Sequence, residues 1–495
     1  MLDVKRIESL RHAAVAPVLH VIDGTSRPSR DGATSEVISP LDGRAMAVMA
    51  WGTAADAEDA IAAARRAFED GRWSGLPPAE RKRIMLRWAA LIEAQALDLA
   101  VLGVRNNGTE IGMALKAEPL SAAATIRYYA EAVDKIFGEI APTGDDVLGL
   151  VHRAPVGVVG AIVPWNFPLM IGAWKLGPAL AAGNTVVLKP AETASLTLVR
   201  IAELALEAGM PAGVLNVVLG EGKVVGEAMS LSPEIDVLVF TGSGGVGRRL
   251  LENAAKSNLK RVYLELGGKS PNIVFADAPS LDEAVKVSAM GIFRNSGQVC
   301  VAGSRLLVER SIHDEFVARL VRATEAMKVG DPLDPATAAG AVNSLAQLEQ
   351  NLRFVAEARA MGRAIATGGG RVLEATGGYY MAPTIVTGVN PADSLAQAEV
   401  FGPVLAVMPF DTEDEAVAIA NGTDYGLAAA VWTTSLSRAH RMVRRLRAGI
   451  VHVNTYGGSD LTVPLGGVKQ SGNGHDKSLH AFDKYLDLKS AWIRL

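Results

Sequence analysis

Residues 156–190 read VGVVGAIVPWNFPLMIGAWKLGPALAAGNTVVLKP, a short β-rich run followed by a helix-length segment and a second β-rich run. The runs at 156–164 and 185–190 are rich in β-branched valine, which favours strands over helices. Similar runs lie at 214–220, 236–242 and 261–266, and the intervening segments 167–181, 194–208, 222–230 and 244–256 have the length of helices. Five strands that alternate with four helices predict an α/β fold with a doubly wound, mostly parallel sheet of the Rossmann type.

A second α/β unit is predicted downstream of Gly267, where the alternation begins again. Strands are expected at 272–277, 305–310, 383–387 and 403–409, and helices at 281–295 and 313–327. Upstream of the first sheet, helical periodicity covers 56–70, 77–103 and 121–138, with Asp56 as a capping residue and Pro77-Pro78 at the start of the second helix. A chain of 495 residues exceeds what a single core holds, so two large domains are expected.

Composition excludes several classes of protein. The formal charge of −4 comes from 49 basic and 53 acidic residues without a basic stripe, so no nucleic-acid partner is expected. No apolar run reaches the roughly 18 to 20 residues of a membrane span, and the N-terminus lacks the apolar core of a signal peptide. The single cysteine suits a reducing compartment, so we expect a cytoplasmic protein with no membrane partner.

Polar residues and glycines follow each strand of the first predicted sheet. Ligands of such sheets bind outside the carboxyl ends of the strands, so these residues are expected to share one site. A glycine-rich start of a helix also offers free backbone amides to an anion, and the whole set predicts a dinucleotide. The set comprises Asn166 after the first strand, Lys189 and Glu192 after the second, Gly222 and Gly226 after the third, Thr241, Gly242 and Ser243 after the fourth, and Glu265 after the fifth.

Three of the polar residues have both a structural and a catalytic interpretation. Cys300, in SGQVCVAGSR, is either a small buried side chain or a nucleophile, and its polar, glycine-containing surroundings favour the nucleophile. Glu265 either lies in solvent at the end of its strand or is a partly buried carboxylate with a raised pKa that acts as a general base. Asn166 forms a turn or donates its side-chain amide to an oxyanion.

The motifs PWNFP, KPAE, FTGS, LELGGKSPNIVF, GQVCVAGSR, EVFGPVL and PLGGVKQSGNG are spread in this order over residues 164–474. Together they resemble those of the NAD(P)-dependent aldehyde dehydrogenase superfamily. The resemblance implies a coenzyme domain from 1–137 and 154–266, a catalytic domain from 267–470, and an oligomerisation element from 138–153 and 484–495. A homo-oligomer, either a dimer or a tetramer, and a small-molecule aldehyde substrate are implied as well, with no metal.

The same resemblance assigns roles to individual residues. Cys300 matches the nucleophile that forms a thioester, Glu265 the base that activates water, and Asn166 the donor to the oxyanion. The residues implied to contact the cofactor are Lys189 and Glu192 at the adenosine ribose, Ser243 at the pyrophosphate, Glu399 and Phe401 at the nicotinamide, and Trp165 and Gly242 in the lining. Because the Glu192 carboxylate would repel a 2′-phosphate, NAD is expected in preference to NADP.

The substrate is less strongly indicated. Residues 461–493, LTVPLGGVKQSGNGHDKSLHAFDKYLDLKSAWI, resemble the γ-glutamyl-γ-aminobutyraldehyde and related aminoaldehyde dehydrogenases of putrescine breakdown. This implies a four-carbon ω-amino aldehyde, free or acylated, and the alternatives are succinate semialdehyde or another aliphatic or aromatic aldehyde. The pocket entrance is expected to comprise Phe167, Met170, Ile171, Trp174 and the loop 456–461, in which Asp460 either binds an amino group or forms a turn.

Arg294, six residues before Cys300, departs from the aromatic residue that many family members have there and is similar to succinate semialdehyde dehydrogenases. One interpretation is that its guanidinium pairs with a substrate carboxylate. The other is that it pairs with a protein carboxylate or points to solvent. Trp174 stands where those enzymes would have a second arginine, which weakens the succinate interpretation. A non-catalytic relative and a CoA-acylating enzyme are disfavoured, since each is expected to lack one of the three catalytic residues.

Overall fold

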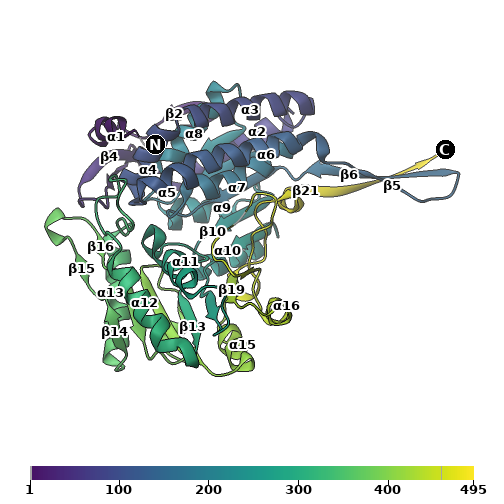
Figure 1. Ribbon diagram of the computed structural model, residues 1–495. Coiled ribbons are helices and arrows are strands. Elements are labelled where there is room, and N and C mark those ends of the chain that lie inside the picture. The colour runs from purple at the N-terminus through teal and green to yellow at the C-terminus, as the bar shows by residue number, and fades with distance from the viewer. Residues whose placement is uncertain (1–2, 459) are drawn as a thin grey trace.

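The first sheet is the doubly wound sheet that the alternating runs predict. In the computed structural model, which describes residues 3–458 and 460–495, it contains seven strands (Figure 1). Five of them are parallel and run in the order β11-β10-β7-β8-β9. Their bounds are β7 (Val158–Ile162), β8 (Thr185–Lys189), β9 (Leu215–Val217), β10 (Val237–Thr241) and β11 (Arg261–Glu265). The predicted Rossmann-type order is therefore confirmed.

Helices cover both faces of this sheet, as the sequence predicts. They are α7 (Pro168–Ala181), α8 (Leu196–Glu207), α9 (Glu227–Leu231) and α10 (Gly244–Lys256), and a π-helical turn over Gly222–Gly226 precedes α9. Two short antiparallel strands, β1 (His20–Ile22) and β2 (Thr25–Arg27), extend the sheet beyond β9. Three residues are too few to show a strand periodicity in the sequence, so these strands were not predictable.

The N-terminal helices differ from the prediction in two details. The first elements are α1 (Val4–Arg11), the hairpin β3 (Thr34–Ile38) and β4 (Ala45–Ala50), α2 (Ala54–Glu69), α3 (Pro78–Ala94), α4 (Ala96–Asn107), α5 (Ile111–Leu115) and α6 (Ser121–Ala132). The prediction of a single helix over 77–103 is wrong, because the backbone leaves helical geometry at Gln95 and two helices result. Asp56 is not the N-cap: Thr53 caps α2, and Asp56 completes a capping box with it.

A second seven-stranded sheet has the order β14-β17-β18-β13-β12-β19-β20, in which only β14 is antiparallel. The strands are β12 (Pro271–Val274), β13 (Arg305–Glu309), β14 (Ala364–Thr367), β17 (Thr384–Thr387), β18 (Val404–Phe410), β19 (Ala428–Trp432) and β20 (Ile450–Val453). The accompanying helices are α11 (Leu281–Phe293), α12 (His313–Glu325), α13 (Leu345–Ala360), α14 (Ser394–Gln397), α15 (Glu413–Asn421) and α16 (Leu436–Arg445), with a small ladder of β15 (Arg371–Val372) and β16 (Tyr380–Met381). The helix expected over 281–295 ends at Phe293.

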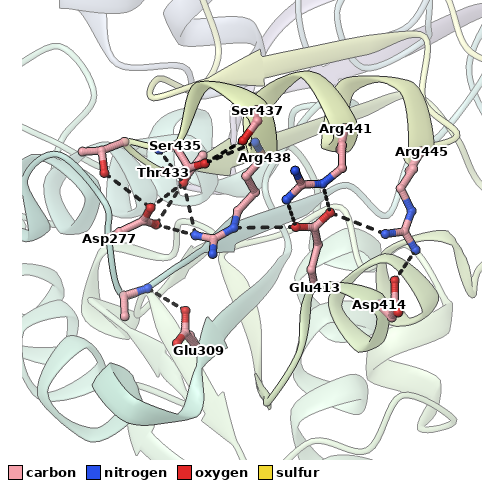
Figure 2. A network of polar contacts seen from close by, with 12 residues as sticks. Asp277, Glu309, Glu413, Asp414, Thr433, Ser435, Ser437, Arg438, Arg441 and Arg445 are labelled. Carbon is pink, nitrogen blue, oxygen red and sulfur yellow. Dashed lines mark hydrogen bonds and ion pairs between the residues drawn. The ribbon is translucent and has the colours of Figure 1, made fainter.

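A network of ion pairs joins α15 and α16 at one side of this sheet (Figure 2). Glu413 lies 2.7 Å from Arg441 and 3.5 Å from Arg445, and Arg438 lies 2.7 Å from Asp277, which follows β12. The Glu413 side chain is only 19% exposed, whereas Arg441 and Arg445 are 52% and 38% exposed, so solvent weakens each of these pairs. The shared carboxylate of Glu413 nevertheless fixes how α16 is oriented against its neighbour.

A three-stranded antiparallel arm projects from the body of the molecule (Figure 1). It comprises β5 (Glu139–Ala141), β6 (Val147–Pro155) and β21 (Leu486–Arg494), so the segments 138–153 and 484–495 lie side by side. Ile140, Leu488 and Trp492 on this arm are 75%, 67% and 74% exposed. By the strand register Leu488 and Trp492 lie on one face of the arm and Ile140 on the other, so both faces present large apolar side chains to solvent. The division into coenzyme, catalytic and oligomerisation domains stays a prediction.

Candidate active site

One cavity of about 450 Å³ brings together the three residues with predicted catalytic roles. Asn166 follows β7, Glu265 ends β11, and Cys300 lies in the segment between α11 and β13. The first two come from the first sheet and the third from the polypeptide that leads into the second sheet. The full lining is Pro164, Trp165, Asn166, Ile171, Thr241, Gly242, Ser243, Gly244, Gly245, Arg248, Glu265, Leu266, Gly267, Cys300, Gln347, Gln350, Glu399, Phe401 and Tyr425.

Cys300 follows a strained turn in which three consecutive residues are left-handed. The φ angles of Asn295, Ser296 and Gly297 are 50°, 51° and 74°, a conformation that costs non-glycine residues about 1–2 kcal/mol each. A Cβ at Gly297 would lie 2.1 Å from the Gly402 carbonyl oxygen, so only glycine fits there. Two contacts from upstream of α5 hold the turn: Asn295 N donates to Glu110 Oε1 at 3.1 Å, and Thr109 Oγ1 to Asn295 Oδ1 at 2.8 Å.

The Cys300 thiol is half-buried and surrounded by acidic groups. Burial raises the pKa of Cys300 to about 12, and the carboxylates of Glu399 and Glu265 act in the same direction. This shift favours the protonated thiol at neutral pH. Since only the thiolate is nucleophilic, a base must remove this proton when a reaction begins.

Asn166 is oriented as a hydrogen-bond donor toward the segment that carries Cys300. Its side chain is 3% exposed, and Nδ2 donates one proton to the Gln298 carbonyl at 2.8 Å. The Asn295 side chain in turn donates to the Asn166 carbonyl at 3.2 Å. An amide nitrogen carries two protons, so one N–H of Asn166 remains for a ligand in the cavity. A neutral, preorganised donor at this place suits a developing oxyanion.

Glu265 lies against a buried cluster of charged side chains that the sequence did not reveal. Lys175 and Lys484 both contact the carboxylate of Asp476, Lys484 at 2.5 Å, and all three are almost fully buried. Burial raises the pKa of Glu265 well above its ordinary value, as does the nearby Asp476, while the two lysines oppose the shift. The Asp476 carboxyl keeps a lowered pKa because the two lysines outweigh its own burial. Glu265 Oε1 has no hydrogen-bond partner among the described residues.

The opposite part of the cavity is lined by the carboxyl end of β10 and the start of α10. Ser243 caps α10, with its side chain 3.4 Å from the Val246 N–H, and the following glycines leave backbone amides open to the cavity. The Thr241 hydroxyl is buried and has no partner within the described part of the chain. Trp165 and Phe401 contact each other edge to face, with 5.2 Å between the ring centroids.

Glu399 lines the cavity and comes from the segment between α14 and β18 of the second sheet. The Gly268 N–H donates to Glu399 Oε1 at 2.8 Å, and a Cβ at Gly267 would lie 2.0 Å from the same carboxylate. Burial raises the pKa of Glu399 to about 7, while Lys269 acts against this shift. The two glycines of LELGG thus allow the carboxylate to approach the backbone between Glu265 and the second sheet.

Lys189, Glu192, Gly222 and Gly226 form a neighbouring cluster at the same edge of the sheet. Glu192 Oε1 accepts hydrogen bonds from Lys189 Nζ at 3.1 Å and from the Gly222 N–H at 2.6 Å. Burial lowers the pKa of Lys189, and Glu192 opposes this shift. A Cβ at Gly226 would contact Lys189 and Ile162 at 3.8 and 3.6 Å, so this glycine allows close packing of the segment. The predicted cofactor residues of the first sheet thus follow four adjacent strands, β9, β8, β7 and β10, whereas Glu399 and Phe401 come from the segment before β18.

Four of the predicted pocket residues belong to the apolar cluster that contains Val299, the residue before Cys300. Phe167, Ile171 and Trp174 are buried in a cluster with Val299, and Met170 packs against that cluster. Trp174 Nε1 has no partner among the described residues, and Lys477 Nζ lies 5.5 Å from its ring centroid. The Asp460 carboxylate is exposed and accepts the N–H and hydroxyl of Thr462, the geometry of a turn. Residue 459 of the expected loop 456–461 lies outside the described residues.

Arg294 has no carboxylate within ion-pair distance in the part of the chain that the structure describes. Its Nη1 donates weakly to the Gly457 carbonyl at 3.4 Å, and its Nε is buried without a partner. Burial lowers the pKa of Arg294, against the electrostatic effect of Tyr456, Cys300 and Glu110. Pairing with a protein carboxylate is therefore not observed.

A family model described as the aldehyde dehydrogenase family matches residues 27–491, nearly the whole chain. The chain belongs to the aldehyde dehydrogenase family. The resemblance carried by its motifs is thereby confirmed.

Close relatives match this aldehyde dehydrogenase over almost its whole length. It is 49% identical over 474 residues to the NADP/NAD-dependent aldehyde dehydrogenase PuuC of Escherichia coli K12, covering 96% of this chain and 95% of that protein. A solved indole-3-acetaldehyde dehydrogenase in complex with NAD+ has a TM-score of 0.98 and 52% identity over 100% of both chains. A γ-glutamyl-γ-aminobutyraldehyde dehydrogenase from Burkholderia cenocepacia J2315 has a TM-score of 0.97 and 50% identity, again over 100% of both. The predicted fold class is confirmed at the level of the whole chain.

Several residues of the aldehyde dehydrogenase site were absent from the sequence prediction. Lys175 is a lone lysine within the apolar helix α7, a signal that could have marked it as functional. Asp476 lies 301 residues further along the chain, and no local pattern links the two. Glu110 and Thr109 lie in a loop without a distinctive motif. Across the described residues, no group of three His, Cys, Asp or Glu side chains could hold a metal ion, and no helix there is long and apolar enough to cross a membrane.

The raised pKa of Cys300 predicts how fast this thiol is alkylated. We expect the rate of reaction with iodoacetamide to increase about tenfold per pH unit from pH 7 to 10, because the thiolate fraction increases in that proportion below a pKa near 12. Mass spectrometry gives the rate unambiguously, since the chain has one cysteine. The urea-unfolded chain is the control, and its rate should level off above about pH 9. A folded-state rate that levels off below pH 9 would contradict the raised pKa.

Proposed function

We propose that this aldehyde dehydrogenase oxidises an aldehyde to its carboxylic acid through a thioester on Cys300, with NAD as hydride acceptor. The observation that carries the proposal is the shared cavity of Cys300, Asn166 and Glu265, which also opens onto the glycine-rich start of α10. A nucleophile, a neutral donor and a carboxylate with a raised pKa are the three groups that acyl chemistry requires. Among the described residues Glu265 Oε1 has no hydrogen-bond partner, and Asn166 Nδ2 makes one hydrogen bond with its two protons.

The described residues fit a dinucleotide. The start of α10 and the unpartnered Thr241 hydroxyl suit a pyrophosphate, while Glu399 and Phe401 lie between this helix and Cys300. Lys189 and the Gly222 N–H both use Oε1 of Glu192, which leaves Oε2 to accept hydrogen bonds from ribose hydroxyls. A 2′-phosphate would meet that carboxylate, which supports NAD over NADP. Bound NAD supplies the acceptor for the hydride that leaves the former aldehyde carbon.

The protein groups divide the reaction into two stages. The Cys300 thiolate adds to the carbonyl carbon, a C–S bond forms, and the oxygen that gains the electron pair receives hydrogen bonds from Asn166 and the Cys300 amide. After loss of the hydride the acyl group is held as a thioester. Glu265 then takes a proton from water, the resulting hydroxide equivalent adds to the thioester, and the C–S bond breaks to release the acid.

The proposed substrate is an aminoaldehyde or its γ-glutamyl conjugate. The 50% identity to a γ-glutamyl-γ-aminobutyraldehyde dehydrogenase supports this, and the unpaired Arg294 guanidinium suits the carboxylate of such a conjugate. A second candidate is an aromatic aldehyde. The 52% identity to an indole-3-acetaldehyde dehydrogenase and the buried cluster of Phe167, Ile171 and Trp174 favour it.

We also propose that the arm of β5, β6 and β21 assembles the chain into a homo-oligomer. The exposed side chains of Ile140, Leu488 and Trp492 support this role, because a second copy would remove them from water. Strand β20 at the end of the second sheet has one open edge, to which a strand from another copy could add.

Two substitutions test the reaction. Cys300→Ser should reduce turnover by at least about 10³-fold, because the alcohol is a much weaker nucleophile. Glu265→Gln should retain a rapid burst of one NADH per site but slow the steady state by about 10²–10⁴-fold, because Glu265 is assigned to the activation of water and not to the deprotonation of Cys300. Stopped-flow absorbance at 340 nm separates the two phases. Full turnover by the serine variant, or loss of the burst in the glutamine variant, would contradict the assigned roles.

A substitution of Arg294 tests the substrate. Arg294→Gln should raise KM about 10- to 100-fold for γ-glutamyl-γ-aminobutyraldehyde, since a charge-assisted hydrogen bond to the carboxylate is lost. The neutral indole-3-acetaldehyde is the internal control, and its KM should change by less than about twofold. An equal effect on both aldehydes would show that Arg294 does not recognise a carboxylate.

A charge placed on the arm tests the assembly. Trp492→Asp should lower the molar mass in light scattering from a multiple of one chain toward a single chain, because a carboxylate would be buried in the interface. Val48→Asp is the matched control, since Val48 is an exposed apolar strand residue elsewhere in the fold. A wild-type enzyme that is already monomeric would refute the proposed role of the arm.

A further inference from the structure

The Tyr456 hydroxyl links the loop at the expected pocket entrance to Val301, the residue that follows Cys300. Tyr456 Oη donates to the Val301 carbonyl at 2.8 Å, and the tyrosine side chain is almost completely buried. Burial raises the pKa of Tyr456 further above its ordinary value, so the hydroxyl remains a donor throughout the working pH range. The contact links two segments that are 155 residues apart in the sequence.

The ring of Tyr456 has little freedom to move away from this contact. A Cβ at Gly291 would lie 3.1 Å from the ring, and one at Gly303 would lie 3.0 Å from it, so two glycines enclose the aromatic side chain. The His452 ring lies 5.6 Å away between centroids and is tilted by 34°. Because the ring is enclosed on these sides, its hydroxyl is held at one position.

The Val301 carbonyl, which accepts the hydrogen bond from Tyr456, belongs to the tight turn that contains Cys300. Ala302 N donates to the Val299 carbonyl at 2.9 Å, which closes a four-residue turn with Cys300 and Val301 at its centre. The orientation of this turn sets both the direction of the Cys300 sulfur and that of the Cys300 backbone amide. On the other side, the loop reaches the strained segment before Cys300, since the Gly457 carbonyl contacts Arg294.

We propose that Tyr456 is a positioning residue, whose hydroxyl orients the Cys300 turn so that the sulfur and the backbone amide act on the same carbonyl group. The inference rests on the proposed function, because it concerns addition to an aldehyde. It predicts a specific defect when the hydroxyl is removed. Addition to a carbonyl should suffer, because it needs the sulfur and the oxyanion donors together, whereas alkylation at a saturated carbon needs only an accessible thiolate.

The test is Tyr456→Phe, which removes one oxygen and retains the ring. The rate of the first NADH burst should fall at least about tenfold, while the rate of iodoacetamide alkylation at the same pH and the KM for NAD stay within about twofold of the wild type. Tyr380→Phe is the matched control, since the Tyr380 hydroxyl also donates to a backbone carbonyl, that of Leu41 at 3.2 Å, far from the cavity. It should leave the burst and the alkylation rate unchanged.

A second variant addresses the same contact from the other side. Gly303→Ala places a methyl group against the ring and should reproduce the selective loss of the burst. Unchanged bursts in both variants would overturn the positioning role, and so would parallel losses of burst and alkylation, which indicate a loosened structure. A wild-type enzyme that forms no NADH from any of these aldehydes would instead refute the proposed function, and the positioning role with it.

Discussion

The parallel pairing of β7, β8, β10 and β11 is the constraint on which the site depends. Ile162 pairs with Lys189 and with Phe240, and Thr241 pairs with Glu265, so the strands end at one edge within a residue of each other. A slip of one residue in any pair would turn a catalytic or cofactor side chain to the opposite face of the sheet. Strands β7, β8 and β10 are buried on both faces, whereas β11 at the end of the sheet has one partly exposed face, and the apolar contacts of two helix layers maintain that register.

Burial shifts three acidic groups of the cavity toward their neutral forms. Burial raises the pKa of Cys300 to about 12 and that of Glu399 to about 7, and it raises the pKa of Glu265 as well. Close to Glu265 but outside the cavity lining, the ammonium groups of Lys175 and Lys484 both form ion pairs with the carboxylate of Asp476. The raised pKa of Cys300 lowers the fraction of reactive thiolate at neutral pH, which slows its reaction with unrelated electrophiles.

The sequence was informative wherever the signal is local. Short valine-rich runs separated by helix-length segments predicted both sheets, and the residues after these runs predicted part of the cavity lining, including Asn166, Thr241 and Glu265. The sequence did not predict features that depend on contacts between residues far apart in the chain. The ion pair of Lys175 and Asp476 joins residues 301 positions apart, and the left-handed turn at Asn295 uses non-glycine residues that a helical pattern hides. The roles of individual site residues still rest on the family resemblance and on geometry.

The solitary cysteine has a consequence for the durability of this enzyme. A sulfenic acid formed on Cys300 by peroxide would find no second thiol in the chain with which to condense, because the other 494 positions contain none. A protective disulfide within the polypeptide is therefore excluded, and repair must come from thiols dissolved around the protein. The number of turnovers before irreversible over-oxidation is then set by the reducing capacity of the surroundings.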